Sequence, residues 1–124
     1  MKIAFASKEN KMIDEHFGWC QKFFVYEVNR ESVSFLKEID SSLRKEDESE
    51  KLFYKIECIA ECDIVYVLQI GPKAAAMVQR AGIIPLRSAD EHESVDAAIL
   101  KVQTLIKEEP PLWLQRILLK HQDE

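Results

Sequence analysis

The sequence predicts a three-layer α/β domain in which one mixed, five-stranded sheet is covered by helices on both faces. Three short β-type segments come first, and segments with helical periodicity then alternate with short apolar runs. A meander followed by βαβ units forms a mixed sheet, and its crossover helices cover both faces. At 124 residues the chain has the length of one domain with a substantial core.

The N-terminal third supplies a meander of strands. Residues 2–6 (KIAFA) are an apolar run, and residues 23–28 (FFVYEV) are rich in β-branched and aromatic side chains. The turn NRE leads into residues 32–38 (SVSFLKE), in which apolar and polar side chains alternate. Such alternation is typical of a strand with one solvated face.

A helix and a central strand follow. Residues 40–50 are a charged connector that enters the helix. Its predicted buried stripe consists of Leu52, Phe53, Ile56, Ile59 and Ala60. Residues 63–70 (DIVYVLQI) are nearly all apolar, which indicates a central strand covered on both faces. We expect Cys58 and Cys62 to pack in the core, and Asp63 to cap the turn before the strand.

The C-terminal half predicts a second βαβ unit. Residues 71–82 (GPKAAAMVQRAG) indicate a helix with Pro72 in its first turn and Gly82 just past its last. The proline in residues 83–86 (IIPL) favours an edge strand. From about Glu91 an amphipathic helix is expected, with a stripe of Val95, Ala98, Ile99, Val102, Leu105 and Ile106.

Two prolines at 110 and 111 end that helix, and residues 112–119 can form one more. We therefore expect one domain over residues 1–109 and a helical appendage over residues 110–124. His92 and His121 lie in polar stretches and are expected to be solvated.

Composition narrows the class of protein. A formal net charge of −5 argues against nucleic-acid binding through a general basic face. No apolar run approaches the length of a membrane span, and residues 1–20 do not show the charged-then-apolar pattern expected of a signal peptide. Three cysteines, an odd number, favour free thiols and a cytoplasmic location.

Two loops are expected to meet at the carboxyl ends of the parallel strands, where ligands of α/β sheets usually bind. One follows the first strand and holds His16, and the other is Gly71-Pro72-Lys73, which opens a helix. The unpaired N–H groups and the dipole of that helix favour an anion, and Lys73 adds a positive charge. Gly71 leaves room for a ligand to approach the backbone.

The first loop contains the segment DEHFGWC, in which several residues have two interpretations. His16 is either a metal ligand or a side chain that hydrogen-bonds its own loop. Cys20 follows four residues later, which is compatible with shared metal ligation, but the pair is weak evidence and an inert, partly buried thiol is the favoured interpretation. Phe17 fits the core, and Gly18 fits a turn that needs positive φ.

Three segments resemble one known family. KIAFAS, IDEHFG and FFVYEV are similar to the start of the dinitrogenase iron–molybdenum cofactor biosynthesis family. ECDIVYVLQIGPKAAAMVQRAGIIPL resembles its second half, although Gly-Pro stands where many members have Gly-Gly. The tail EEPPLWLQRIL is similar to the ending of nitrogen-fixation accessory members.

The resemblance implies a ribonuclease-H-like fold and a site for the iron–molybdenum cofactor of nitrogenase or its iron–sulfur precursor. It also implies transfer of this metallocluster between cofactor assembly proteins rather than catalysis, and it makes His16 the cluster contact. The expected site is His16, Phe17, Gly18, Cys20, Gly71, Pro72 and Lys73, with His16 and Cys20 as metal ligands. Cys20 occupies a position that the family motif does not fix.

Two other functions compete with this one. A metal-dependent nuclease on the same fold needs clustered carboxylates on the sheet, and KIAFAS offers none. A protein-interaction module could instead use Trp113, Leu114 and Leu118 as an exposed stripe, unless these side chains fold back onto the core.

Overall fold

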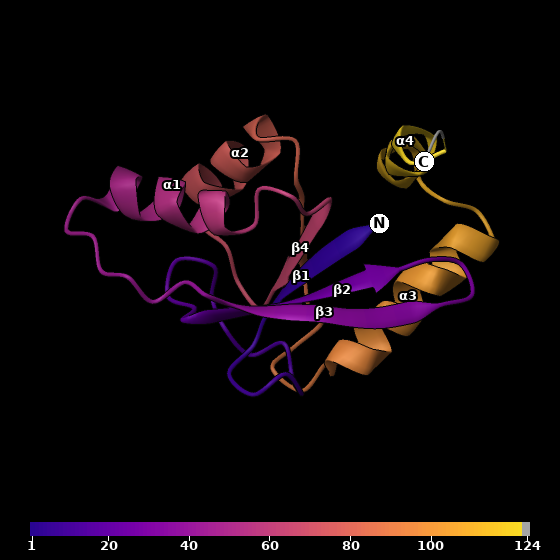
Figure 1. Ribbon diagram of the computed structural model, residues 1–124, viewed down its shortest axis with the longest axis horizontal. Coiled ribbons are helices and arrows are strands. Elements are labelled where there is room, and N and C mark those ends of the chain that lie inside the picture. The colour runs from indigo at the N-terminus through magenta and orange to yellow at the C-terminus, as the bar shows by residue number, and fades with distance from the viewer. Residues whose placement is uncertain (123–124) are drawn as a thin grey trace.

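The protein is a mixed sheet between two layers of helices, and a computed structural model describes residues 1–122. Its elements in chain order are β1 (Lys2–Ala6), β2 (Lys22–Val28), β3 (Val33–Asp40), α1 (Glu48–Cys58), β4 (Ile64–Val67), α2 (Pro72–Arg80), β5 (Ile84–Arg87), α3 (Val95–Lys107) and α4 (Leu112–Lys120). Figure 1 shows α1 and α2 over one face of the sheet and α3 against the other. The predicted order of elements is confirmed.

The five strands lie in the order β3-β2-β1-β4-β5. β1 is central, since it pairs antiparallel with β2 and parallel with β4. β5 extends the parallel half as an edge strand, where Pro85 is tolerated because one side of the strand needs no donor. The predicted three-layer α/β class is confirmed, and this strand order is compatible with a ribonuclease-H-like fold.

Each face of the sheet has its own core. Under α1 and α2 the cluster includes Ala4, Phe23, Val25, Leu52, Ile56, Val65 and Val78. Under α3 it includes Ile3, Phe5, Val28, Ile64, Tyr66, Ala98 and Val102. Because successive strand residues point to opposite faces, β1 and β4 contribute to both cores. Among residues 1–122, no helix combines the length and the apolar character needed to cross a membrane.

Side-chain caps set where two of the helices begin. The Asp47 carboxylate accepts the Glu50 N–H, and the Ser94 hydroxyl accepts the Ala97 N–H. Helix α3 therefore begins at Val95, whereas the sequence predicted a start near Glu91.

Several details differ from the predictions. Leu105 was predicted in the buried stripe of α3, but it is exposed near the end of that helix. Phe53 is 59% exposed, because only the side of α1 that carries Leu52 and Ile56 faces the sheet. Ala60 is also exposed, since α1 ends at Cys58. The two faces of β3 do not differ in burial as predicted. Nearly all of the strand is exposed, because it lies at the edge of the sheet where the helices do not cover it.

The final helix closes the amino-terminal end of the central strands, near Met1 (Figure 1). Leu114 and Ile117 are buried in the same core as Met1, and Trp113 and Leu118 are partly buried against it. The stripe considered as an exposed docking surface therefore packs onto the sheet layer. Of the predicted appendage, residues 123 and 124 lie outside the described residues.

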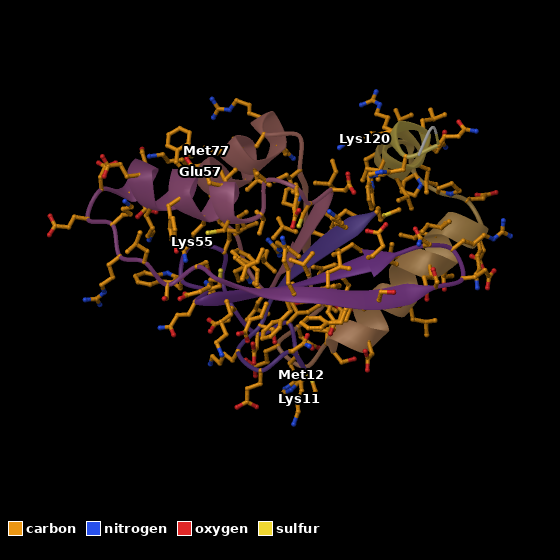
Figure 2. All side chains as sticks on the ribbon, in the orientation of Figure 1. Lys11, Met12, Lys55, Glu57, Met77 and Lys120 are labelled. Carbon is orange, nitrogen blue, oxygen red and sulfur yellow. The ribbon has the colours of Figure 1, made fainter. Side chains whose placement is uncertain are left out.

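A buried carboxylate fixes this helix. Asp63 Oδ2 accepts the Lys2 N–H at 3.0 Å and lies 2.8 Å from His121 Nε2, and Oδ1 accepts the Lys120 ammonium at 3.2 Å. The prediction that His121 is solvated is therefore wrong, and Asp63 links β1 to the last helix rather than only capping a turn. Lys120 is labelled at this end of the molecule in Figure 2.

Candidate functional site

The loop after β1 is held against an extension of β4. The Leu68 N–H donates to the Glu15 carbonyl at 3.0 Å, and the Phe17 N–H donates to the Gln69 carbonyl at 2.9 Å. His16 and Gln69 form an isolated parallel bridge. The backbone of His16 is therefore fixed at the carboxyl end of the sheet, where it pairs with the extension of β4 as a continuation of β1 would.

A tight turn then directs some side chains of this loop into the core and others to the solvent. The Cys20 N–H donates to the His16 carbonyl at 2.9 Å, which closes one helical turn. Phe17 and Cys20 are fully buried in the core under α1, whereas His16 is exposed. The buried aromatic ring thus anchors a turn that presents the imidazole to solvent.

The second loop leads from β4 into α2. Gly71 is the N-cap of this helix and offers no side-chain cap, Pro72 occupies the first turn, and no acidic residue lies there. The first N–H groups of α2 therefore keep their positive partial charge. The Lys73 ammonium donates to the Ser49 hydroxyl at 2.8 Å, and among the described residues no carboxylate lies within ion-pair distance of it.

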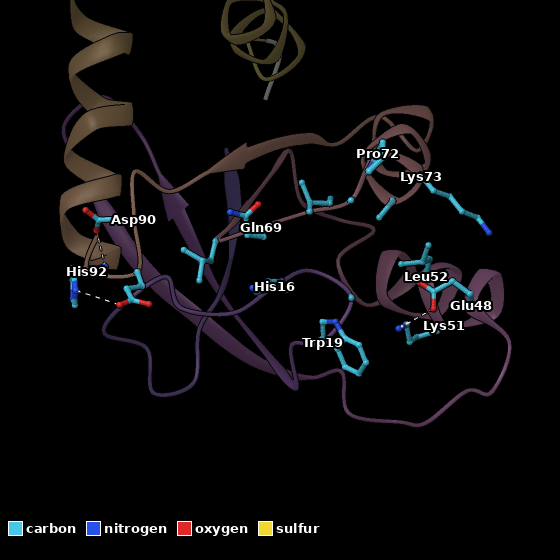
Figure 3. A pocket seen from close by; sticks show the side chains of 16 residues that line it. His16, Trp19, Glu48, Lys51, Leu52, Gln69, Pro72, Lys73, Asp90 and His92 are labelled. Carbon is cyan, nitrogen blue, oxygen red and sulfur yellow. Dashed lines mark hydrogen bonds and ion pairs between the residues drawn. The ribbon is translucent and has the colours of Figure 1, made fainter.

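One cavity of about 970 Å³ brings the two loops together. Its lining contains His16 and Gly18 from the first loop and Gly71, Pro72 and Lys73 from the second. Figure 3 shows His16 between two groups of side chains, one around Trp19 and Lys51 and the other around Asp90 and His92. The size is that of sites for small molecules and cofactors, about 300–1,000 Å³.

The two sides of the cavity differ in charge. On one side Lys51 lies over the Trp19 ring, 4.6 Å from its centroid, and pairs with Glu48 at 3.1 Å. On the other side the His92 N–H donates to the Asp90 carboxylate at 2.8 Å, and the His92 ring lies 3.5 Å from the Glu91 carboxylate. Lysine side chains lie near the N-terminus of α2, and exposed carboxylates lie near the start of α3.

Two residues of the expected site are not in this cavity. Phe17 is in the core, and Cys20 is fully buried with its thiol donating to the Phe17 carbonyl at 3.3 Å. Burial raises the pKa of the Cys20 thiol to about 11, which disfavours the thiolate that a metal requires. The structure does not present His16 and Cys20 together as ligands. Within residues 1–122, no three His, Cys, Asp or Glu side chains gather as a metal-holding group.

Several lining residues were not anticipated. Trp19 is 75% exposed at the rim of the cavity. An indole that follows a glycine in a polar loop is a sequence signal that could have identified it. Lys51 and Gln69 carry no such signal, since their place in the lining depends on how α1 and the end of β4 pack. His92 is exposed, as expected, yet it also lines this cavity.

The fold and the cavity define a small α/β domain with an open cavity at the carboxyl end of the parallel strands, where ligands of such sheets usually bind. A family model described as "Dinitrogenase iron-molybdenum cofactor" matches residues 1–105. The chain belongs to this family.

Relatives agree with this assignment, and a solved structure has the same fold. Protein NifX of Herbaspirillum seropedicae is 35% identical over 99% of this chain and 85% of its own length. Protein NifX of Azotobacter vinelandii is 29% identical over 95% of this chain and 75% of its own. The apo orange protein of Desulfovibrio gigas has the same fold, with a TM-score of 0.60, 20% identity and coverage of 81% and 84% of the two chains.

Proposed function

We propose that this protein binds the iron–molybdenum cofactor of nitrogenase, or its iron–sulfur precursor, and carries it between cofactor assembly proteins without catalysing a reaction. The proposal rests on one observation: a single cavity is lined by both His16 and the uncapped N-terminus of α2. Membership of the dinitrogenase iron–molybdenum cofactor family and the NifX relatives support a role in nitrogenase cofactor biosynthesis in the cytoplasm.

The electrostatics of the cavity suit such a cargo. A sulfide-bridged iron cluster is multiply anionic, and a helix N-terminus without an acidic residue stabilises negative charge. Lys73 adds positive charge at this helix start, and Lys51, paired with Glu48, lines the same side of the cavity. Gly71 has no atom within 4 Å of the place where a Cβ would stand, so a bulky guest can approach the backbone there.

The chemistry of the ligands suits a carrier that must also release its cargo. A neutral imidazole at His16 can bind one iron and still exchange. A cage of four thiolates would hold a cluster tightly, and the thiol of the nearby Cys20 is buried away from the cavity. The carboxylates of Asp90 and Glu91 on the far side repel an anion, which favours release.

Anaerobic titration with the isolated iron–sulfur precursor tests the proposal. We expect a coloured complex that co-elutes with the protein, and we expect His16→Ala to weaken binding by about tenfold, as loss of one ligand implies. His92→Ala is the matched control, because it removes an exposed imidazole from the far side of the same cavity. The control should retain nearly the full affinity.

Other outcomes would redirect the assignment. Equal affinity of the His16→Ala variant and the wild type would remove His16 from the site. Binding of neither the cofactor nor its precursor would overturn the carrier role and favour a protein-interaction module. Metal-dependent cleavage of RNA or DNA would favour a nuclease.

A further inference from the structure

A second cavity of about 600 Å³ adjoins the first and has no role in the proposal above. The two cavities share Gly18, Trp19, Glu48 and Lys51 as a common wall. The second one lies between α1, the turn after His16 and the connector that follows β3. It is lined by these residues and by Cys20, Gln21, Ser41, Ser42, Leu43, Arg44, Lys45, Glu46 and Lys55.

The charge of this lining is opposite to that of the protein. The whole chain has 22 acidic and 17 basic residues, yet four cations line the second cavity against two carboxylates. One of the carboxylates, Glu48, is already paired with Lys51. The remaining cations are Arg44 and Lys45 on the exposed connector and Lys55 on α1.

Lys55 is the unusual member of this group. Its side chain is buried, with 4% exposure, and its ammonium donates to the carbonyls of Cys20 and Ser41. Figure 2 labels Lys55 below α1, on the side of the connector. In the part of the chain that the structure describes, no carboxylate lies within ion-pair distance of this ammonium. Two carbonyl dipoles compensate a buried charge only in part, so a counter-charge nearby would be stabilising.

We propose that the second cavity binds a small polyanion that carries phosphate or carboxylate groups. Lys55 and both of its carbonyl acceptors line the cavity, so an anion there would lie beside a buried ammonium that has no ion pair among the described residues. Arg44 offers the bidentate fork that phosphate and carboxylate groups prefer, and Lys45 adds a second flexible cation. The site shares only one pair of charged residues with the cluster site, Glu48 and Lys51 in the common wall.

Trp19, which lies in the wall shared by the two cavities, gives a spectroscopic reporter of binding. In a Trp113→Phe background, Trp19 is the remaining indole. Titration with inorganic phosphate and with citrate, at ionic strength held constant with sodium chloride, should give a saturable change in its fluorescence for at least one anion. A response to phosphate alone, or to citrate alone, supports the proposal and identifies which group the site prefers.

The double variant Arg44→Ala/Lys45→Ala should weaken this binding by about tenfold, because it removes two charge-assisted contacts. Its matched control is Arg80→Ala/Lys107→Ala, which removes the same charge from helices α2 and α3 outside the second cavity. Lys55→Met should abolish binding. If that variant does not fold, the comparison of the two double variants still decides.

Two results would overturn the proposal: no saturable response to either anion, or equal loss of affinity in the two double variants. The assay contains no metallocluster, so its failure is separate from a failure of the carrier role. Conversely, loss of cluster binding in His16→Ala should leave the fluorescence titration with phosphate or citrate unchanged.

Discussion

The polar groups at the two ends of the central strands β1 and β4 differ in burial and in hydrogen bonding. At the amino end, the Asp63 carboxylate is 3% exposed and contacts Lys2, Lys120 and His121, under cover of α4. At the carboxyl end, His16 and Lys73 are exposed, and the first N–H groups of α2 have no side-chain cap. The polar groups at the amino end have hydrogen-bond partners and are covered, whereas those at the carboxyl end are exposed.

This difference separates stability from function within one sheet. A buried carboxylate with several donors contributes to the folded state, because removing its partners or the charge itself leaves costly groups behind. Exposed groups that lack partners contribute little to folding, yet they are free to bind a guest. The Asp63 network, meaning Lys2, Asp63, Lys120 and His121, should therefore be sensitive in folding assays, and the cavity residues should be sensitive in binding assays.

The largest expected effect is at the closed end. Asp63→Ala should lower the free energy of unfolding by about 3 kcal/mol, because it leaves three donors around an empty carboxylate position. Urea denaturation measures this change. Lys73→Ala at the open end is the control, and it should change the free energy of unfolding by less than about 0.5 kcal/mol. Similar losses in both variants would contradict the contrast between the two ends.

The pH dependence of stability should report on the same carboxylate. Burial by itself would raise the pKa of Asp63, but the Lys2 N–H, His121 and Lys120 outweigh it and hold that pKa below its ordinary value. Its stabilising contribution is therefore complete above the unfolded-state pKa of about 3.9 and is lost as the pH falls through the folded-state value.

The stability advantage of the wild type over Asp63→Asn should accordingly shrink as the pH falls from about 5 to about 3. Denaturant midpoints across this range measure it. An advantage that grows between these two pH values would mean that the folded-state pKa of Asp63 is raised, against the network described here.

The smallest effects sharpen the comparison at two glycines that flank α2. Gly82 has φ +85°, so Gly82→Ala should cost about 1 kcal/mol of unfolding free energy. Gly71 has φ −72° and open space where a Cβ would stand, so Gly71→Ala should be nearly neutral for folding. If a guest approaches the backbone at Gly71, this second variant should still bind the iron–sulfur precursor more weakly, and unchanged binding would remove that contact from the site.

The candidate site was only partly visible in the sequence. The motif around His16 and the glycine–proline start of α2 pointed to two loops, and the parallel pairing of β1 with β4 places both on one cavity. Cys20 was a plausible ligand by spacing, but the turn closed by the His16 carbonyl directs its side chain into the core. Lys51 enters the lining because α1 packs beside that turn, and this packing joins residues that are distant in the sequence.

The sequence alone determined the order of strands and helices, because hydrophobic periodicity, prolines and caps act over a few residues. It also determined which residues could carry charge or bind iron. Only the tertiary structure decided which of them meet. Asp63 reaches His121 across 58 positions of the chain, and Lys55 reaches Ser41 across 14. Such contacts form when elements pack, and a local pattern does not contain them. For the same reason β3, although its pattern resembles that of a half-buried strand, lies exposed at the sheet edge, where no helix covers it.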